Sequence, residues 1–309
     1  MAKKLNRQVI CDVLIEKGRE DKDIMVLCSD SSGSSSMTAF HKELPDQFIE
    51  VGIAEQNLVT ISAGLASCGK KPFAVSPASF LSTRSMEQVK VDVGYSGTNV
   101  KLVGVSGGVS YGALGLTHHS VNDFATMGSN PGIRVYCPSD PVQTEKLTRA
   151  LLEDEKGAYI RVGRYPSEYI YEEDVPFELN KAMKIREGKD AAIIACGEMV
   201  PYAVKAAELL AEEGIDASVI DMYCIKPIDR EAVLEATKTG VIVTAEEHVA
   251  FGGLGSLVSQ IVAEVGGAKV GSITLPDAPV IAGEQWEVFD YYGMNAEGIA
   301  KTVKEMLAK

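Results

Sequence analysis

The chain has 309 residues, which exceeds the usual size of one hydrophobic core and predicts two domains. Its composition is 46% apolar and 24% charged, as in soluble globular proteins, and its formal net charge of -13 argues against a nucleic-acid partner, which would need a basic surface. Since no apolar run is long enough to span a membrane and the N-terminus has no signal-type core, we expect a cytoplasmic protein without membrane contact.

Strand and helix patterns alternate along residues 1–166. Apolar, β-rich runs predict strands at 23–30, 71–80, 99–108, 133–140 and 157–164. Helical patterns lie between them, at 57–69, 82–95, 120–130 and 141–154. Ser82 or Thr83 is expected to cap the second of these helices, Ser120 the third, and Pro141 begins the fourth. Such alternation predicts a mainly parallel sheet covered on both faces.

The pattern breaks at 167–184, a stretch rich in Tyr, Pro and acidic residues that we interpret as a linker. A second α/β block follows at 185–309, without an internal repeat. The sequence therefore predicts an α/β fold of two doubly wound domains. The first carries a mainly parallel sheet, and the second carries a smaller mixed sheet.

Unusual polar residues follow several of the predicted strands. In open parallel sheets, ligands bind at the carboxyl ends of the strands, so these residues are candidates for one site. Together they would supply an acid or base, proton-relay groups and an anchor for phosphate or carboxylate. They are Asp30, Ser34, Glu55, His118, His119, Arg161 and Arg164.

Each candidate also has a purely structural interpretation. Glu55 could be an acid favoured by a helix N-terminus, and the adjacent histidines lack the spacing of a metal site. The glycines of "SGGVSYG" and of "FGGLGS" (251–256) could serve tight turns and close packing rather than a ligand. One of the two arginines could simply be a surface charge.

The order of motifs resembles the C-terminal half of transketolases. The matching segments are "FIEVGIAEQN", "SPASFLSTRSMEQV", "GVSYGALGLTHHSVNDF", "CPSDPVQTEKL", "AYIRVGR" and "AEEHVAFGGLGSLV", and together they cover essentially the whole chain. The resemblance is greatest to the C-terminal subunit of split bacterial transketolases, with a pyrimidine-binding domain followed by the transketolase C-terminal domain. It implies an enzyme that transfers a two-carbon ketol unit between sugars with thiamine diphosphate.

The resemblance also implies roles for residues around the cofactor. Glu55 would donate a hydrogen bond to the aminopyrimidine ring and promote its imino form, which requires a protonated carboxyl group shielded from water. Phe80 would stack on the ring, and Gln56 would lie beside it. Asp30 would lie near the thiazolium ring.

For the sugar, the resemblance implies that His118 contacts hydroxyl groups and moves protons, with His119 next to it. Arg164 would hold the sugar phosphate, with Arg161 as the alternative, and Ser34 would lie near the donor phosphate. The chain departs from the family at Leu114, where many members have an aspartate that recognises an acceptor hydroxyl. We therefore expect a non-standard sugar specificity.

The chain contains no "GDG" sequence, the motif with which the family holds Mg²⁺ and the diphosphate. The resemblance therefore implies an N-terminal partner subunit that carries this motif, a two-plus-two heterotetramer, and no activity from this chain alone.

Three alternatives remain open at the level of sequence. The beta subunits of 2-oxoacid dehydrogenases share the "GIAEQ" glutamate, but would not be expected to carry "GLTHHS" or a sugar-phosphate arginine. Deoxyxylulose-phosphate synthases are further relatives, usually of greater length. A non-catalytic regulatory protein would not be expected to retain Glu55, Phe80, His118 and Arg164.

Overall fold

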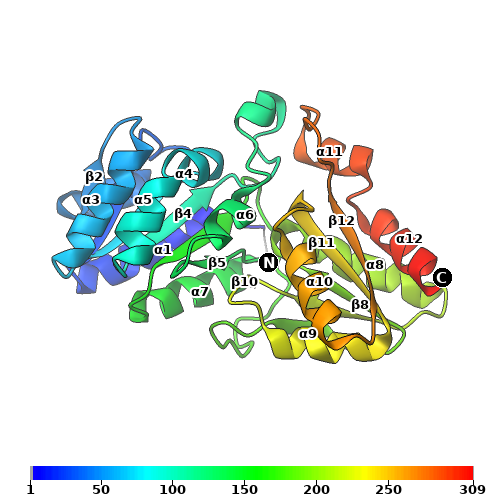
Figure 1. Ribbon diagram of the computed structural model, residues 1–309. Helices are drawn as coiled ribbons and strands as arrows, with labels where there is room; N and C mark the ends of the chain where they lie inside the picture. The colour runs from blue at the N-terminus through cyan, green and yellow to red at the C-terminus, as the bar shows by residue number, and fades with distance from the viewer. Residues whose placement is uncertain (1–2, 309) are drawn as a thin grey trace.

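The N-terminal half of the chain, together with one strand from the C-terminal half, forms a seven-stranded sheet in the computed structural model, which describes residues 3–308 (Figure 1). The strand order is β10-β5-β6-β4-β3-β1-β2, and only β10 runs antiparallel to its neighbour. The strands are β1 (Ile24–Cys28), β2 (Phe48–Glu50), β3 (Lys71–Pro77), β4 (Lys101–Val105), β5 (Arg134–Tyr136), β6 (Ala158–Val162) and β10 (Cys224–Lys226). Strands β1, β4 and β6 are buried along their whole length, as parallel strands covered on both faces should be.

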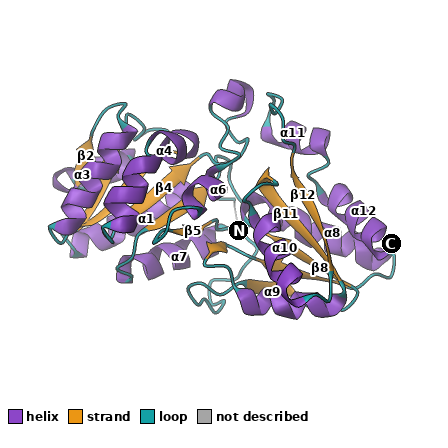
Figure 2. Cartoon of the chain, viewed as in Figure 1, coloured by secondary structure: helices purple, strands orange, loops and turns teal. Residues whose placement is uncertain are grey.

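Two groups of helices pack on this sheet (Figure 2). In one group α1 packs against α7, and in the other α3 packs against α4 and the π-helical turn Val89–Tyr95. The helices are α1 (Asn6–Glu20), α2 (Thr38–Glu43), α3 (Glu55–Ser67), α4 (Ala78–Arg84), α5 (Met86–Gln88), α6 (Asp123–Gly128) and α7 (Pro141–Glu153). Helix α7 begins at Pro141, as expected, and the Asp140 side chain caps it by accepting a hydrogen bond from the Gln143 amide.

The region around Phe80 differs from the sequence prediction. The expected strand at 71–80 ends at Pro77, and α4 begins at Ala78, so Phe80 lies in the first turn of a helix. Proline lacks an amide donor and ends the strand ladder here. Ser82 and Thr83 therefore lie inside the helix and do not cap it.

The start of α6 also differs from the prediction. Ser120 does not cap it, because its backbone forms a bridge with Gly108. The helix begins three residues later, at Asp123. The bridge closes the long loop between β4 and α6, which carries both histidines.

The C-terminal half forms a five-stranded mixed sheet in the order β12-β11-β8-β9-β7, with β7 antiparallel to β9. Its strands are β7 (Met183–Arg186), β8 (Ala191–Ala195), β9 (Ala217–Asp221), β11 (Val241–Val249) and β12 (Lys269–Leu275). Its helices are α8 (Val200–Glu212), α9 (Arg230–Ala236), α10 (Leu254–Val265), α11 (Gln285–Tyr292) and α12 (Ala296–Leu307). The predicted fold class, two α/β domains with a mainly parallel and a smaller mixed sheet, is confirmed. Among residues 3–308, no helix combines the length and the apolar character that a membrane span requires.

The two halves are more closely joined than a simple linker would make them. Strand β10 comes from the second block of the sequence, yet it pairs with β5 of the first sheet. Tyr223, just before β10, stacks on Tyr136 with ring centroids 6.1 Å apart. Within 167–184, Tyr171 is buried and donates a hydrogen bond to Asp221, 2.9 Å away. The segment is therefore a fixed part of the contact between the halves.

Candidate active site

Glu55 lies at the edge of the first sheet, where the chain turns from β2 into α3. Gly52 makes this turn with a φ of +74°, a conformation that suits glycine. The carboxylate of Glu50 accepts hydrogen bonds from the backbone amides of Asp30, at 2.6 Å, and Gly52, at 3.1 Å. Glu50 thus ties the loop after β1 to the loop before α3. Glu55 is the first residue of α3 and only 4% exposed.

The carboxylate of Glu55 contacts Arg84, at the end of α4. One Arg84 nitrogen, Nη1, lies 3.2 Å from both carboxylate oxygens. The guanidinium carbon also lies 4.2 Å from the centre of the Phe80 ring, so the arginine bridges Glu55 and Phe80. Glu55 therefore lies at the N-terminus of a helix and beside a guanidinium group.

Phe80 belongs to a cluster of three rings, with His118 and Tyr111. The His118 ring lies edge-on to Phe80, with centroids 5.2 Å apart, and edge-on to Tyr111, at 5.4 Å. The hydroxyl of Thr117 bonds to Nδ1 of His118 at 2.9 Å. His118 is only partly buried, so it can meet a ligand.

Arg164 adds positive charge at the end of this cluster. Its guanidinium carbon lies 5.0 Å from the centre of the Tyr111 ring. Arg7, on α1, donates to the Arg164 carbonyl oxygen at 2.8 Å and to the Ser36 hydroxyl at 3.2 Å. Burial and the charge of Arg164 lower the pKa of Arg7. Within residues 3–308 neither arginine is paired with a carboxylate, so the two form a place for an anion.

These contacts connect side chains from α1, α3, α4, the β4–α6 loop and the end of β6 into one continuous group. It runs from a buried carboxyl group, past aromatic rings and an imidazole, to the guanidinium group of Arg164 and to Arg7, which donates to the Arg164 backbone. We call this group the site row. Its members are Glu55, Arg84, Phe80, His118, Tyr111, Arg164 and Arg7.

Three other predicted residues lie on the loops nearby. Asp30 is exposed, with a φ of +53°, directly after β1. Ser34 donates a hydrogen bond to the Ser31 carbonyl at 3.1 Å. Gln56 is exposed and lines an open depression of about 560 Å³ together with Glu55 and Arg84. In residues 3–308, no three His, Cys, Asp or Glu side chains gather as a possible metal site.

The structure corrects the expectation for His119. Its side chain is buried, and Nε2 donates to the Gly112 carbonyl oxygen at 3.0 Å, which holds the β4–α6 loop closed. Burial lowers the pKa of His119, and this favours the neutral ring. His119 therefore shapes the loop from inside, whereas its neighbour His118 is open to a ligand.

The structure also corrects the alternative role of Arg161. Arg161 is 3% exposed and lies 3.1 Å from Asp123 and 3.1 Å from Glu247, a residue of β11 in the second domain. Gln285 donates to Glu247 at 2.8 Å and also to Glu198. We call these five residues the interdomain cluster: Asp123, Arg161, Glu247, Gln285 and Glu198. Arg161 is fully engaged in it and is not available to a sugar phosphate.

The glycines of "SGGVSYG" make room for this cluster. A Cβ atom at Gly107 would overlap the Arg161 side chain, and one at Gly108 would overlap the Glu247 carboxyl group. Glu247 also accepts a hydrogen bond from the Val109 amide at 2.8 Å. The glycine pair thus serves the contact between the domains and fixes the start of the loop that carries His118.

The second glycine run has a similar role. Glu246 accepts hydrogen bonds from the amides of Leu254, at 2.6 Å, and Gly255, at 2.7 Å, and so caps α10. A Cβ at Gly253 would overlap the same carboxyl group. The close-packing interpretation of "FGGLGS" therefore holds, and the protein's own carboxylate occupies the helix N-terminus.

Sequence reasoning missed two members of the site row, Arg84 and Arg7. Arg84 follows Phe80 by four residues, which on a helix places both on one face, but the region around Phe80 was assigned to a strand. Arg7 comes from the first helix, far from every recognised motif. Tyr111, in contrast, follows a predicted strand together with His118, and its position already makes it a candidate from the sequence.

Comparison with known proteins identifies the family. Residues 3–166 match the model of the transketolase pyrimidine binding domain, and residues 180–299 match that of the transketolase C-terminal domain. The chain is 48% identical to one of the subunits of the apulose-4-phosphate transketolase of Phocaeicola vulgatus, over 98% of this chain and 97% of that protein. It is 37% identical to a 6-deoxy-6-sulfo-D-fructose transketolase subunit of a Clostridium species, over 97% and 94% of the two chains.

A solved structure described as a split gene transketolase in an inactive beta4 tetramer superimposes with a TM-score of 0.90 and 35% identity. The alignment covers 99% of each chain. Sequence and structure thus match over nearly the whole chain, including the C-terminal domain. The chain belongs to the transketolase family, as the C-terminal subunit of a split transketolase.

Proposed function

We propose that this chain is the pyrimidine-binding subunit of a thiamine-diphosphate-dependent enzyme that transfers a two-carbon ketol unit from a ketose phosphate to an aldose phosphate. The observation that carries the proposal is the site row. It places a buried carboxyl group, an aromatic ring, an imidazole and two arginines in one contact chain. The carboxyl group and the aromatic ring would serve the cofactor, the imidazole would serve the sugar hydroxyl groups, and the guanidinium groups would serve the phosphate.

When bound, thiamine diphosphate supplies a carbon nucleophile and an electron sink. Glu55 and Phe80 would suit its aminopyrimidine ring, because Arg84 contacts both the shielded carboxyl group and the aromatic face. Glu55 would hold a proton at the ring nitrogen and so favour the imino form. Since Arg84 contacts both oxygen atoms of the Glu55 carboxylate, a bound pyrimidine would have to share or displace Arg84. Gln56 and Asp30 would lie at the edge of this pyrimidine site.

The other end of the site row suits the sugar phosphate. His118 would orient sugar hydroxyl groups and transfer protons to and from the oxygen atoms. Arg164 and Arg7 would bind the phosphate, since two guanidinium groups that have no carboxylate partner among residues 3–308 match its charge and geometry. Ser34 lies on the same serine-rich loop as Ser36, which contacts Arg7.

A second element of the proposal concerns the identity of the sugar. Leu114 is 55% exposed in the loop that carries His118, where the family commonly has an aspartate. The two relatives compared above are named for apulose 4-phosphate and for a sulfofructose, not for xylulose 5-phosphate or ribose 5-phosphate. These facts support a specificity for a branched or otherwise modified sugar.

The third element is a partner. We propose that an N-terminal subunit with a "GDG" motif supplies Mg²⁺ and the diphosphate site in a two-plus-two assembly. Large apolar side chains are exposed around Glu55, namely Ile53, Ile61 and Tyr95, which supports an interface there. The solved split gene tetramer described as beta4 is also described as inactive.

Reconstitution tests the proposal. The chain, alone and mixed with a "GDG"-bearing subunit, would be assayed with thiamine diphosphate, Mg²⁺ and a panel of ketose and aldose phosphates that includes xylulose 5-phosphate and apulose 4-phosphate. We expect ketol transfer only from the mixture. Turnover by the chain alone would contradict the need for a partner, and 2-oxoacid decarboxylation in place of ketol transfer would contradict the reaction. A preference for ordinary pentose phosphates would contradict the altered specificity.

A further inference from the structure

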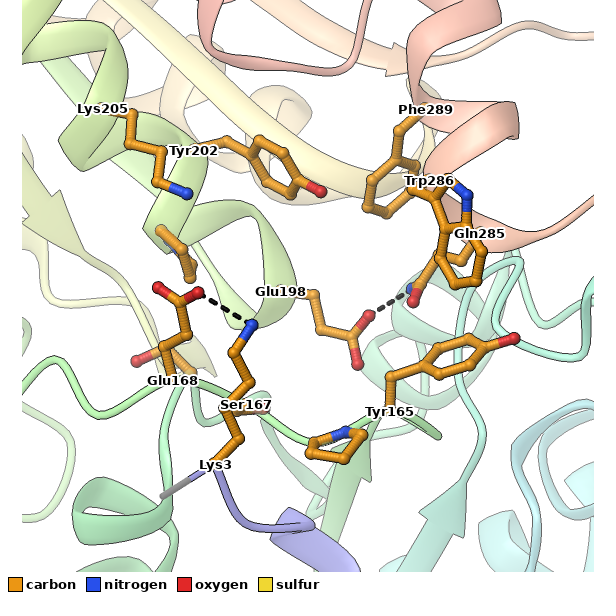
Figure 3. A pocket seen from close by; sticks show the side chains of 13 residues that line it. Lys3, Tyr165, Ser167, Glu168, Glu198, Tyr202, Lys205, Gln285, Trp286 and Phe289 are labelled. Carbon is orange, nitrogen blue, oxygen red and sulfur yellow. Dashed lines mark hydrogen bonds and ion pairs between the residues drawn. The ribbon is translucent and has the colours of Figure 1, made fainter. Parts of the chain in front are cut away.

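A cavity of about 340 Å³ lies between the two domains, and no residue of the site row lines it (Figure 3). Residues of the first domain and of the N-terminus form one wall, and α8 and α11 of the second domain form the other. It shares no lining residue with the depression beside Glu55. Its volume is within the range of pockets that bind small molecules.

Aromatic side chains form much of this cavity. Trp286 lies edge-on to Tyr165, with centroids 5.6 Å apart, and Phe289 lies edge-on to Tyr202, at 5.7 Å. Trp286 remains 52% exposed although it lines the cavity. A rigid aromatic surface open to solvent in a concave site is suited to stacking against a flat ring.

One end of the cavity carries an unneutralised carboxyl group. Glu198 receives a hydrogen bond from Gln285, and it forms no ion pair with any residue in 3–308. Burial, together with the nearby charge of Glu247, raises the pKa of Glu198 to about 8. A carboxyl group that keeps its proton near neutral pH can both donate and accept a hydrogen bond. It therefore matches an amino group next to a ring nitrogen.

The opposite end carries positive charge. Lys205, on α8, is exposed, and its ammonium group points into the cavity (Figure 3). Lys3 also lines this end, but its ammonium group lies 2.8 Å from the Glu168 carboxylate, which balances its charge. Of the two lysines that line the cavity, Lys205 is therefore the one available to attract an anion.

We propose that this interdomain cavity is a binding site for a small anion that carries an amino-substituted planar ring, the chemical class to which nucleoside monophosphates belong. The ring lies against Trp286, its amino edge meets Glu198, and the anionic group meets Lys205. The site is distinct from the ketol-transfer site and does not depend on the activity proposed above.

The chain contains a single tryptophan, Trp286, so its fluorescence reports directly on the cavity. The full chain would be titrated with AMP as the probe, and with adenosine and inorganic phosphate as its two halves, by tryptophan fluorescence and by calorimetry. We expect AMP to change the fluorescence in a saturable manner. We also expect AMP to bind at least about tenfold more tightly than either half, because both ends of the cavity are then used.

Substitutions test whether AMP binds in this cavity. Lys205→Glu and Glu198→Leu should each weaken AMP binding about tenfold, and Glu198→Gln should retain it, because an amide also donates and accepts. The matched control is Lys301→Glu, the same charge change on α12, where the lysine side chain is 75% exposed. Absence of saturable AMP binding, equal effects of Lys205→Glu and Lys301→Glu, or loss of binding in Arg164→Met, which would place AMP at the site row, would each overturn the proposal.

Discussion

The site row and the interdomain cluster use the same kinds of side chain for opposite purposes. Both contain arginine and glutamate in contact, and both include residues from β6 or the loop that follows it. In the site row, Arg84 and His118 remain accessible, and Arg7 and Arg164 lack a carboxylate partner among residues 3–308. In the interdomain cluster, Arg161 is enclosed between two carboxylates from different domains.

The degree to which the charged side chains are buried explains the difference between the two regions. A charge taken out of water must be paired, so Arg161, Asp123 and Glu247 satisfy one another and fix the position of the domains. Groups at an open edge can remain partly unpaired, and this leaves them free to bind a ligand. The same residue type three positions away in the sequence, Arg164, thus has a different role from Arg161.

Glu55→Gln should have the largest effect and would test the site row directly. We expect turnover of the reconstituted enzyme to fall by about 10²–10⁴-fold, because an amide cannot hold the exchangeable proton at the pyrimidine. The chain should still fold and bind its partner, since the side chain that Glu55 contacts, Arg84, is half exposed. Steady-state kinetics and size-exclusion chromatography would check both points. Normal turnover would remove Glu55 from the proposed chemistry.

The variants Arg161→Met and Arg164→Met test the difference between the interdomain cluster and the site row. Arg161→Met leaves Asp123 and Glu247 buried without their cation, so the free energy of unfolding should fall by about 3–5 kcal/mol in urea titrations. Arg164→Met should change the free energy of unfolding by less than about 0.5 kcal/mol, yet raise KM for the sugar phosphate at least about tenfold. Equal stabilities of the two variants would contradict the distinction between the regions.

Gly108→Ala tests whether the interdomain cluster fixes the loop of His118. Gly108 has a φ of +61°, and its Cβ would overlap Glu247, so we expect a loss of about 2–4 kcal/mol in the free energy of unfolding. Gly97→Ala is the control, with a φ of +64° and no described atom within 4 Å of the added Cβ. It should cost only about 1 kcal/mol. Similar losses in both variants would show that backbone strain, rather than contact with Glu247, sets the cost.

The smallest expected effect concerns pH. Asp221, at the end of β9 and hydrogen-bonded to Ser139 of the first domain, is fully buried, and burial raises its pKa from 3.8 to about 7. Its protonated form is therefore favoured in the folded protein. Stability should be lost as the pH rises between these two values. In Asp221→Asn the melting temperature should depend less on pH over this window, as measured by calorimetry. An unchanged pH dependence would mean that Asp221 does not titrate there.

Much of the fold could be predicted from the sequence. Alternating apolar strands and amphipathic helices specify two α/β halves, because the periodicity of each element is a local property. Local signals also place Glu55 at a helix start after a glycine turn and Pro141 at the start of α7. The pairing of β10 with β5 of the first sheet could not be predicted, because these two strands are far apart in the sequence.

The sequence by itself determined the family, the two-domain α/β fold and the position of Glu55, because motifs and hydrophobic periods are encoded by neighbouring residues. Only the tertiary structure decided which of two adjacent histidines and which of two nearby arginines is open to a ligand. It also brought Arg84 and Arg7 to the site row. The physical reason is burial by distant partners. Arg161 is enclosed by Glu247, 86 residues away, and no local pattern records which side chain will meet the second domain.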